Sequence, residues 1–403
     1  MRHTLLPALL ASSWTLTATA QTSLVVPDNF PDIGSAIAAA SPGAVIHVKS
    51  RPLPYPPFVI DKPITIVGSG VDQGAPMVSV TVGIGIDVQL APGERASITR
   101  IDCMSASGAT LTRALVVNGG HLTLEDCRFF GGHDPVGGAG LAVVEAIGAD
   151  LVAVFSRFEG GTRATALRAT TSRVSVVSTR CFGANPDSPG IDAIDSTVHG
   201  NDAWLLGGES FVGTPGGPAL RVAGASSVWF CDSQMRGGMG TPAGSAIVNT
   251  SATAVEIDNN ALTSGLSLGG ATPPPVIVGP SLANPNLVAL RWSEQLYRRG
   301  TMRMGQPWWI YLRGTPSSSM VLGFSFGPTG SAPVLTRQPA LLHNDLLLLL
   351  PLASDAAGNA SFAGGTLPNS ASLFGAGLWA QAATLGSFPV EASPPSGVVV
   401  RPY

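Results

Sequence analysis

The sequence predicts an all-β fold, a right-handed, single-stranded parallel β-helix followed by a small C-terminal β-sandwich. Three observations support this prediction: a composition rich in turn formers, a repeat of about 25 residues, and a proline-rich break after the last repeat. Gly (49) and Pro (33) are frequent, whereas charged residues make up 12% and aromatic residues 6% of the 403 positions. Such a mixture is typical of short strands joined by many tight turns.

The N-terminus has the pattern of an export signal. A short polar start precedes a mostly apolar stretch over residues 5–16, and an A-x-A cleavage site ends at Ala20. A membrane anchor needs roughly 20 apolar residues, and this stretch is shorter and contains Pro7. We therefore expect residues 1–20 to be a signal peptide and the mature chain to be secreted, either extracellular or held at the cell surface.

Internal repetition predicts the β-helix. Seven segments share one pattern, and their first apolar residues, taken as reference positions, are Ile98, Leu122, Leu151, Val174, Val198, Val228 and Val255. The residue seven positions further on is apolar in every copy except the first, which has Ser105. Stacking such units about 4.8 Å apart buries an apolar face that one unit cannot bury alone. Leucine-rich repeats share this period, but their L-x-x-L-x-L-x-x-N pattern is absent here, and propeller blades need about 40 residues or more per repeat.

The residues before the repeats carry a helix and two strand-like runs in a fixed order. A short amphipathic helix is expected over residues 28–40, followed by a turn at Pro42-Gly43 and strands up to residue 67. This order resembles the opening of pectate-lyase-like, right-handed β-helix proteins, in which a helix covers the open end of the stack. The resemblance extends over residues 25–270 and implies a helical cap on a β-helix domain of residues 21–270. It implies no single activity, because that superfamily includes lyases, hydrolases, epimerases, adhesins and inert stalks.

A second module is expected after the repeats. The proline-rich residues 271–280 predict an interdomain linker, and residues 281–403 contain five strand-like runs that favour a β-sandwich. These runs are Leu287–Trp292, Trp308–Arg313, Met320–Phe326, Leu346–Leu352 and Leu373–Ala383. The run Leu346–Leu352 is too short to cross a bilayer and is interpreted as a buried strand. Residues 354–361 resemble the D-x-x-G-N turn of bacterial Ig-like modules on exported proteins, which usually bind, space or anchor.

Charge and motifs exclude several functions. The net charge of −3 gives no reason to expect a nucleic-acid partner. The sequence contains no second long hydrophobic stretch, so we expect no transmembrane segment in the mature chain. The resemblance makes a carbohydrate-active enzyme one possible function. The catalytic motifs of polygalacturonases are missing, however, since Asn249-Thr250-Ser251 lacks the Asp of their N-T-D motif. The lyase motif R-x-P-x-x-R is also missing, and no Lys follows Lys62. Residues 132–135 contain the letters of the epimerase motif D-P-H-D only in part and in another order.

Two sets of charged residues recur at equivalent positions. Glu145, Arg168, Asp192 and Arg221 fall near one outward position of four successive coils, if the last is shifted by one residue. Opposite charges on neighbouring strands attract by roughly 0.2–1 kcal/mol per pair, so a structural ladder is the preferred interpretation and a catalytic acid at Asp192 the alternative. Asp102, Asp126, Asp202 and Asp232 share the position four after the reference, but Phe155 and Ser178 interrupt any calcium stripe. We expect no metal site and no cofactor, with calcium left open but supported by no motif.

Two of the four cysteines share a predicted position. Cys103 and Cys127 both lie five residues after the reference, and adjacent coils bring such residues within the Cα range of a disulfide. A disulfide and an unbridged pair of buried thiols are equally compatible with this spacing. Cys181 and Cys231 occupy other positions and are not paired.

Insertions define the candidate binding surface, which we call the rim. They span residues 131–138, 183–190, 207–217 and 237–244, and all follow the same strand of the repeat, so they should line one edge of the coil. The candidate binding residues on the rim are His133, Asp134, Asp187, Glu209 and Phe211. The alternative is that loops rich in Gly and Pro tolerate insertions because they pack against nothing.

These observations favour a non-catalytic role. We expect an exported surface or matrix protein whose rim contacts an extracellular polysaccharide or a surface protein. The alternative is a polysaccharide lyase or glycoside hydrolase that acts on an extracellular polysaccharide with a non-standard site. Whether the protein is an enzyme is left open by the sequence.

Overall fold

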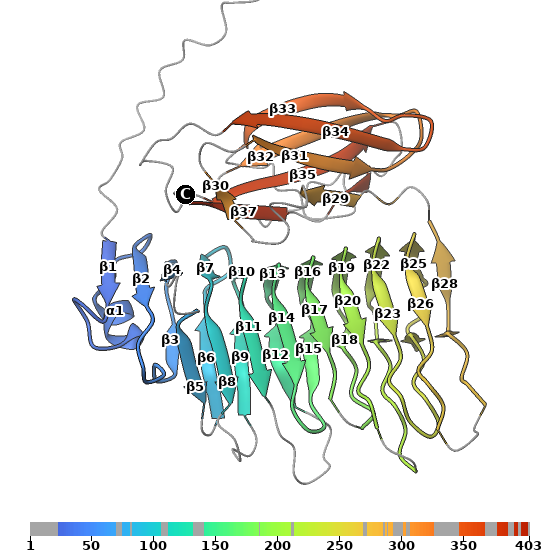
Figure 1. Cartoon of the computed structure of the whole chain (residues 1–403), viewed down its shortest axis with the longest axis horizontal. Coiled ribbons are helices and arrows are strands. Elements are labelled where there is room, and N and C mark those ends of the chain that lie inside the picture. Colours follow the sequence, from blue (N-terminus) through green and yellow to red (C-terminus); the bar gives the residue numbers. More distant parts are fainter. Residues whose placement is uncertain are drawn as a thin grey trace, which may run out of the picture.

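The computed structural model describes most of the chain after the predicted signal peptide. The described residues are 23–69, 75–80, 83–105, 112–131, 141–184, 186–210, 213–268, 272–284, 287, 289–292, 301–303, 307–325, 346–366, 377–385, 391–393 and 396–401. The predicted signal peptide, residues 1–20, lies outside them. Figure 1 shows a long coil of strands with a smaller group of strands lying along it.

Three parallel sheets run along the coil, which confirms the parallel β-helix. Sheet A has eleven strands: β1 (Ser23–Val26), β2 (Val45–Lys49), β4 (Thr65–Ser69), β7 (Arg95–Thr99), β10 (His121–Glu125), β13 (Asp150–Val154), β16 (Arg173–Val177), β19 (Thr197–Asn201), β22 (Ser227–Cys231), β25 (Val255–Asp258) and β28 (Ser281–Ala283). Sheet B has eight strands: β5 (Met77–Val80), β8 (Asp102–Ser105), β11 (Arg128–Gly131), β14 (Arg157–Gly160), β17 (Arg180–Phe182), β20 (Trp204–Leu206), β23 (Gln234–Arg236) and β26 (Ala261–Thr263). Sheet C has nine strands: β3 (Phe58–Ile60), β6 (Gly83–Gln89), β9 (Thr112–Asn118), β12 (Ala142–Ile147), β15 (Thr165–Thr170), β18 (Ile191–Ile194), β21 (Leu220–Ala223), β24 (Ile247–Asn249) and β27 (Ile277–Val278).

Alternate residues of each strand point into the coil and stack on their equivalents. In sheet A, Leu122, Leu151 and Val174 are register partners and are almost completely buried. In sheet B, Phe129 lies beside Phe158, with ring centroids 5.7 Å apart. Burying one such side chain contributes roughly 1.5–3 kcal/mol. The stacked apolar rows therefore form one continuous core along the axis.

The first repeat copy is out of register by two residues in the sequence alignment. Leu122 pairs with Ala96, and Ile98 pairs with Leu124, so Ala96 is the true reference position. A shift of two residues keeps the same face inward, so the alternation of apolar residues does not reveal it. The position four after the reference is then Arg100 in this coil, and Asp102 does not belong with Asp126.

The corrected register separates the two cysteines. Cys103 lies beside Phe129 in sheet B, whereas Cys127 precedes that strand. All four cysteines are buried free thiols. The disulfide left open for Cys103 and Cys127 is therefore wrong; the two thiols are buried and unbridged, as the other alternative expected, but they do not stack on each other.

A left-handed backbone conformation recurs at the corner between sheets A and B. The residues four after the reference have φ between 48° and 54°; they are Arg100, Asp126, Phe155, Ser178, Asp202, Asp232 and Asn259. Asp and Asn tolerate this conformation better than most side chains do. The corner is thus a sufficient reason for the recurrence of Asp at this position.

The N-terminal end of the coil carries a short helix. Helix α1 (Ile33–Ala39) begins after Asp32, whose Oδ1 accepts a hydrogen bond from the Ser35 backbone at 2.7 Å. Ile33, Ala36 and Ile37 are buried in the core of the coil. The helix is shorter than the predicted span of 28–40, because the residues before Asp32 form turns after β1.

The described parts of the rim pack backbone against backbone. Gly217 donates to the carbonyl of Gly208 at 2.9 Å, and Gly238 donates to the carbonyl of Gly217 at 2.8 Å. A Cβ added to Gly244 would lie only 1.9 Å from the carbonyl oxygen of Gly217. The glycines therefore permit a tight layer of loops, so the alternative of loops that pack against nothing is wrong for this part of the rim.

The chain completes one more partial coil before the C-terminal module. Strand β27 pairs with β24, and β28 pairs with β25, so residues 277–283 continue the β-helix. These strands fall in the second half of the segment expected as a linker and at the start of the expected module. The position of the domain boundary itself stays a prediction.

Two small sheets follow and share one core. One contains β29 (Ala289–Trp292), β31 (Pro307–Arg313) and β34 (Asn359–Thr366), and the other β30 (Thr301–Arg303), β37 (Ser396–Arg401), β35 (Gly377–Leu385), β32 (Ser319–Ser325), β33 (Leu346–Ala353) and β36 (Glu391–Ala392). Leu290 and Ile310 of the first sheet are buried in one cluster with Met320 and Leu322 of the second. We call these two sheets the C-terminal module.

One strand of the module differs from its prediction. The run Leu346–Leu352 lies in β33, which is an edge strand among the described strands, with β32 as its neighbour there. Leu348 and Leu349 are 48% and 47% exposed, so the prediction of a buried strand is wrong. Nearby, Asp355 caps the next turn through hydrogen bonds from the backbone of Ala357 and Asn359, both 2.8 Å.

Candidate functional site

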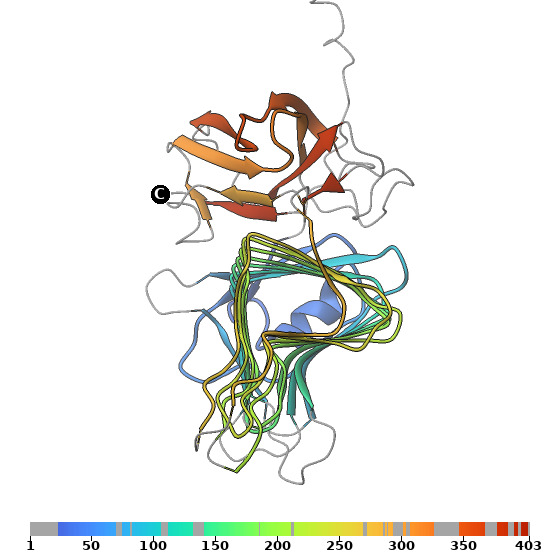
Figure 2. The ribbon, with the colours of Figure 1, turned by 90° about the vertical axis from the view of Figure 1, so that its right-hand side faces the viewer.

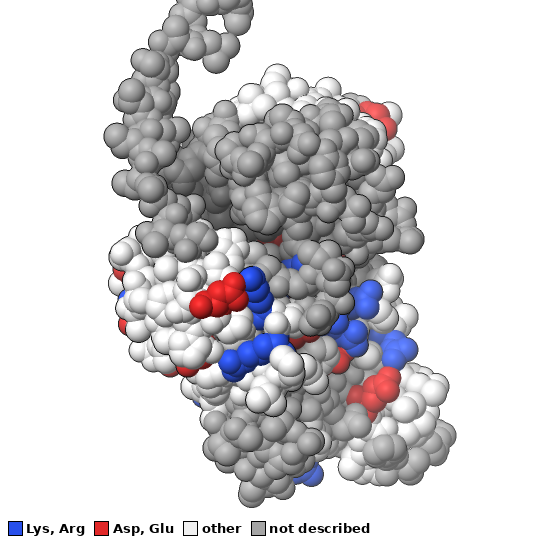
Figure 3. All heavy atoms as spheres, turned by 60° about the vertical axis from the view of Figure 1, so that its left-hand side comes forward, with Lys and Arg blue, Asp and Glu red and all other residues white. Residues whose placement is uncertain are grey.

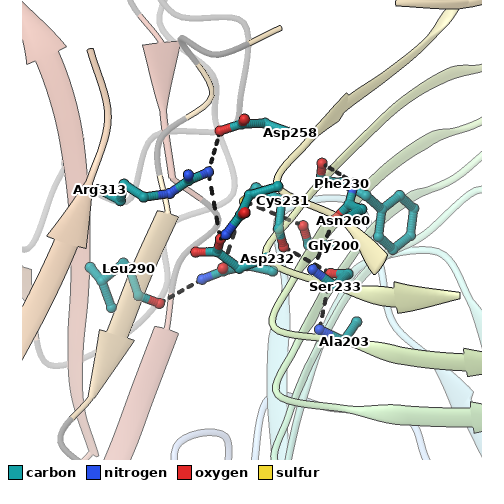
Figure 4. Close-up of polar contacts among 12 residues, drawn as sticks. Gly200, Ala203, Phe230, Cys231, Asp232, Ser233, Asp258, Asn260, Leu290 and Arg313 are labelled. Carbon is teal, nitrogen blue, oxygen red and sulfur yellow. Dashed lines mark hydrogen bonds and ion pairs between the residues drawn. The ribbon is translucent and has the colours of Figure 1, made fainter. Parts of the chain in front are cut away.

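The outer face of sheet A is covered by the C-terminal module. Figure 2 shows the module directly above one side of the coil when the coil is viewed along its axis. Phe155, at a corner of sheet A, packs against the core of the module. Arg313 of β31 reaches Asp258, to which it donates a hydrogen bond, and Asp232, at 3.5 Å (Figure 4). This face is therefore not free to bind a ligand.

Two histidines on sheet A are buried and uncharged. Burial lowers the pKa of His121 to about 4 and that of His199 to about 3. The ring of His199 lies against Trp229, with centroids 4.8 Å apart. A histidine serves as an acid or base near neutral pH when its pKa lies close to neutral. We therefore interpret His121 and His199 as buried residues that contribute to packing rather than as catalytic groups.

The outer face of sheet C carries the predicted charge ladder. Glu145, Arg168, Asp192 and Arg221 are direct register partners on β12, β15, β18 and β21, so no shift is needed at the last. Arg168 lies 3.3 Å from Asp192, and Arg113 lies 3.0 Å from Glu145. Asp192 and Glu145 are nearly buried. Each buried carboxylate thus has an arginine partner, as the structural interpretation of the ladder requires.

The outer face of sheet B carries a row of arginine and aromatic side chains. Arg128, Arg157, Arg180 and Trp204 are register partners on the successive strands β11, β14, β17 and β20. A second outward row, two residues further along these strands, contains Phe130, Glu159, Phe182 and Leu206. We call these two rows together the arginine–aromatic face. The inward residues between them, such as Phe129 and Leu205, are fully buried and fix the orientation of the strands.

Stacking contacts hold the side chains of this face. Trp204 is 41% exposed and meets Phe182 edge to face, with ring centroids 5.1 Å apart. The guanidinium of Arg180 lies 5.3 Å from the centre of the Trp204 ring. Arg157 lies 5.7 Å from the ring of Phe182 and 5.8 Å from that of Phe130, and it also pairs with Glu159. The result is an open surface of ring faces and guanidinium groups on a regular sheet.

The predicted rim residues are only partly described. His133, Asp134 and Phe211 lie outside the described residues. Asp187 is 3.3 Å from Arg221 of sheet C, and Glu209 is 2.7 Å from Arg236 of sheet B. The two described rim carboxylates therefore each pair with an arginine of a flanking sheet. Neither of these contacts brings Asp187 and Glu209 together in one cluster.

Sequence reasoning missed the arginine–aromatic face. The signal was present at the position six after the reference, which reads Arg128, Arg157, Arg180 and Trp204 in four successive coils. Apolar periodicity reports the buried position seven, and it says nothing about the outward positions on either side of it. Figure 3, which shows one side of the molecule, has Lys and Arg side chains lying beside Asp and Glu side chains on the coil below the module.

The described residues offer neither a metal cluster nor a spanning helix. Within the described ranges, no three His, Cys, Asp or Glu side chains come together as a metal site would require. In the same part of the chain, the helix present is far shorter than a membrane span.

Comparisons with known proteins add little to this geometry. No protein-family model matches the chain, and neither does any curated protein. The enzymatically active domain of tailspike protein 2 of bacteriophage CBA120 is 9% identical with a TM-score of 0.35, covering 91% of this chain and 73% of that chain. Tailspike protein 3 of the same phage is 9% identical with a TM-score of 0.15, covering 65% and 62%. Because both TM-scores are below 0.5, the fold assignment rests on the strand pairing, and the pectate-lyase-like resemblance stays a prediction.

Proposed function

We propose that this protein is a non-catalytic, extracellular glycan-binding β-helix, and that the arginine–aromatic face holds the glycan. The observation that carries the proposal is the exposed Trp204 ring, fixed edge to face by Phe182 on the open side of sheet B. An exposed aromatic ring offers an apolar face to the C–H groups of a sugar ring, and it loses little conformational freedom on binding. Single exposed apolar residues are ordinary on protein surfaces, but a ring already fixed by neighbouring rings and arginines is preorganised for a ligand.

The regular spacing of the face suits a polymer rather than a single sugar. Equivalent side chains repeat at every strand, about 4.8 Å apart, so a chain laid along the coil axis meets similar groups at regular intervals. The rim borders this surface, since Glu209 holds Arg236 of β23. We keep the rim residues His133, Asp134, Asp187, Glu209 and Phe211 as the proposed edge of the glycan site.

The catalytic alternative lacks a supporting observation in the described residues. A glycoside hydrolase needs two carboxyl groups that are free to act on the same bond. In the described part of the chain, Glu145 and Asp192 lie next to Arg113 and Arg168 in the ladder of sheet C. An assay of the wild-type protein for unsaturated products and new reducing ends keeps this alternative open to experiment.

The proposal is tested by affinity electrophoresis against a panel of neutral and acidic polysaccharides. Trp204→Ala should weaken binding of the retained polysaccharide roughly tenfold or more, which corresponds to about 1.4 kcal/mol. Trp309→Ala is the matched control, because Trp309 is 36% exposed but lies in the C-terminal module. Equal retardation of Trp204→Ala and wild type, or no retardation by any polysaccharide, would contradict the proposal.

A further inference from the structure

The charge of the arginine–aromatic face specifies the kind of glycan, an inference that rests on the proposed function. Arg128, Arg157 and Arg180 are register partners on three adjacent strands, so three guanidinium groups follow one another along the axis. Like charges directly opposite on neighbouring strands destabilise a sheet. On sheet C the corresponding row alternates in sign. Attraction between opposite charges explains the ladder of sheet C, but it does not explain three adjacent positive charges on sheet B.

Among the described residues, the ion pairs of this row involve the middle arginine. Arg157 pairs with Glu159. Within the described residues, no carboxylate lies within 4.0 Å of Arg128 or Arg180. The neighbouring coil places Asp102 beside Arg128 in register, but at a longer side-chain distance. The face thus exposes two guanidinium groups that form no ion pair with a described carboxylate.

Packing of arginine stems on aromatic rings explains part of the row. Arg157 and Arg180 lie over ring faces, and such cation–π contacts contribute about 0.5–1 kcal/mol at exposed sites. In the described part of the chain, Arg128 has neither a ring beneath it nor an ion-pair partner. Its side chain is exposed. Packing therefore accounts for Arg157 and Arg180, whereas the charge that faces Arg128 is Asp102, its register partner on β8, with which it interacts electrostatically at more than ion-pair distance.

We infer that the arginine–aromatic face binds an anionic polysaccharide, whose carboxylate or sulfate groups are held by Arg128 and Arg180 while Trp204 stacks on a sugar ring. The guanidinium fork binds planar oxyanions through two parallel hydrogen bonds. Arg128 and Arg180 are two strand spacings apart, about 10 Å along the axis. An acidic glycan laid along the coil presents charges repeatedly in this direction, so it can satisfy both arginines at once.

Nucleic acid is the competing polyanion and is less well matched. Non-specific nucleic-acid binding relies on many phosphate contacts and on a positive field. This chain has a net charge of −3, and the two arginines available to a ligand on this face lie in one row. Single-stranded DNA is therefore included in the test as the outcome that would redirect the inference.

The experiment measures binding of the full secreted chain to a polyuronate, a sulfated glycan, a neutral glucan and single-stranded DNA at increasing salt. The double variant Arg128→Gln/Arg180→Gln should lose roughly tenfold or more in affinity for the acidic glycan, and its affinity should depend less steeply on salt. If the polyuronate binds more tightly than the sulfated glycan, the recognised group is a carboxylate; if the sulfated glycan binds more tightly, it is a sulfate. The control Arg51→Gln/Arg173→Gln removes the same charge elsewhere, since Arg51 lies over Tyr55 and Arg173 of sheet A pairs with Asp150, and it should bind as wild type does.

The outcomes separate this inference from the proposed function. One contrary result is binding of the neutral glucan that does not depend on salt, is unchanged in the double variant and is lost in Trp204→Ala. It would overturn the inference that the ligand is anionic but would leave the proposed glycan site in place. Tighter binding of single-stranded DNA than of any glycan would overturn both. Thermal unfolding of each variant shows whether a loss of binding reflects the site or the fold.

Discussion

Asn201, on the outer face of sheet A, donates a hydrogen bond through Nδ2 to the carbonyl oxygen of Leu290 at 2.5 Å, although 89 positions separate the two residues. Asn201 is 1% exposed. Together with Arg313 and its carboxylate partners, this bond fixes the C-terminal module to the side of the β-helix. The two parts therefore share an interface with buried polar contacts, and a change at that interface should affect the stability of both.

Arg313→Gln should destabilise the folded chain by about 2 kcal/mol, because it removes a charged hydrogen-bond donor from Asp258 and an ion pair from Asp232. Burial raises the pKa of Asp258 above its ordinary 3.8, and Arg313 opposes that rise. A carboxyl with a raised pKa binds protons more tightly when folded, so its contribution to stability falls as pH rises from 3.8 through the raised value.

Removal of Arg313 should raise the pKa of Asp258 further. The loss of stability in Arg313→Gln should then be larger at neutral than at mildly acidic pH, as measured by urea unfolding at both. Arg236→Gln is the control, because its pair with Glu209 is exposed and contributes at most about 1 kcal/mol. A loss independent of pH would contradict the assignment of the effect to Asp258.

The four thiols should be free and unreactive in the native protein. Cys103, Cys127, Cys181 and Cys231 are buried, and burial raises the pKa of every one of these thiols. Because the thiolate is the reactive form, a thiol-specific reagent should label none of them before unfolding and all four after unfolding in guanidinium chloride. A mobility change on reduction in gel electrophoresis would show a disulfide and contradict the register that places Cys103 beside Phe129.

Phe129→Ala should be far more costly than Phe130→Ala. Phe129 is fully buried and stacks on Phe158, whereas Phe130 lies on the outer face of the same strand. Truncation of a buried Phe typically costs about 3–5 kcal/mol, and denaturant midpoints of the two variants measure the difference. Similar midpoints for both variants would mean that the strand faces the other way.

Gly244→Ala should destabilise the rim, because the new Cβ would meet the Gly217 carbonyl oxygen at 1.9 Å. The backbone must shift to accommodate it, at a cost of about 1–3 kcal/mol. Gly34→Ala is the matched control, since its Cβ would meet only ordinary contacts at 3.6 Å and beyond, within helix α1. Thermal unfolding should show a lower midpoint for Gly244→Ala alone, and equal midpoints would contradict the tight stacking of the rim.

The repeat pattern predicted the sheets well and their exact register less well. The inward rows through Leu122 and Phe129 follow from apolar periodicity, because only a stacked coil buries them all. Periodicity could not detect the shift of two residues between Ile98 and Ala96, because both positions face inward. The charge ladder through Arg168 and Asp192 was predictable for the same reason as the core, since equivalent positions lie side by side.

By itself, the sequence determined the parallel β-helix, because a repeat with alternating apolar residues specifies both the strand and the face that it buries. Only the tertiary structure decided which outer face stays open. The outward positions of sheets A and B both mix polar and apolar residues, and the module that covers sheet A is joined to it by contacts such as Asn201 to Leu290. Such contacts between distant segments depend on how the chain folds back, a property that no local periodicity encodes. The arginine–aromatic face became a candidate site because the module lies on sheet A and leaves Trp204 exposed.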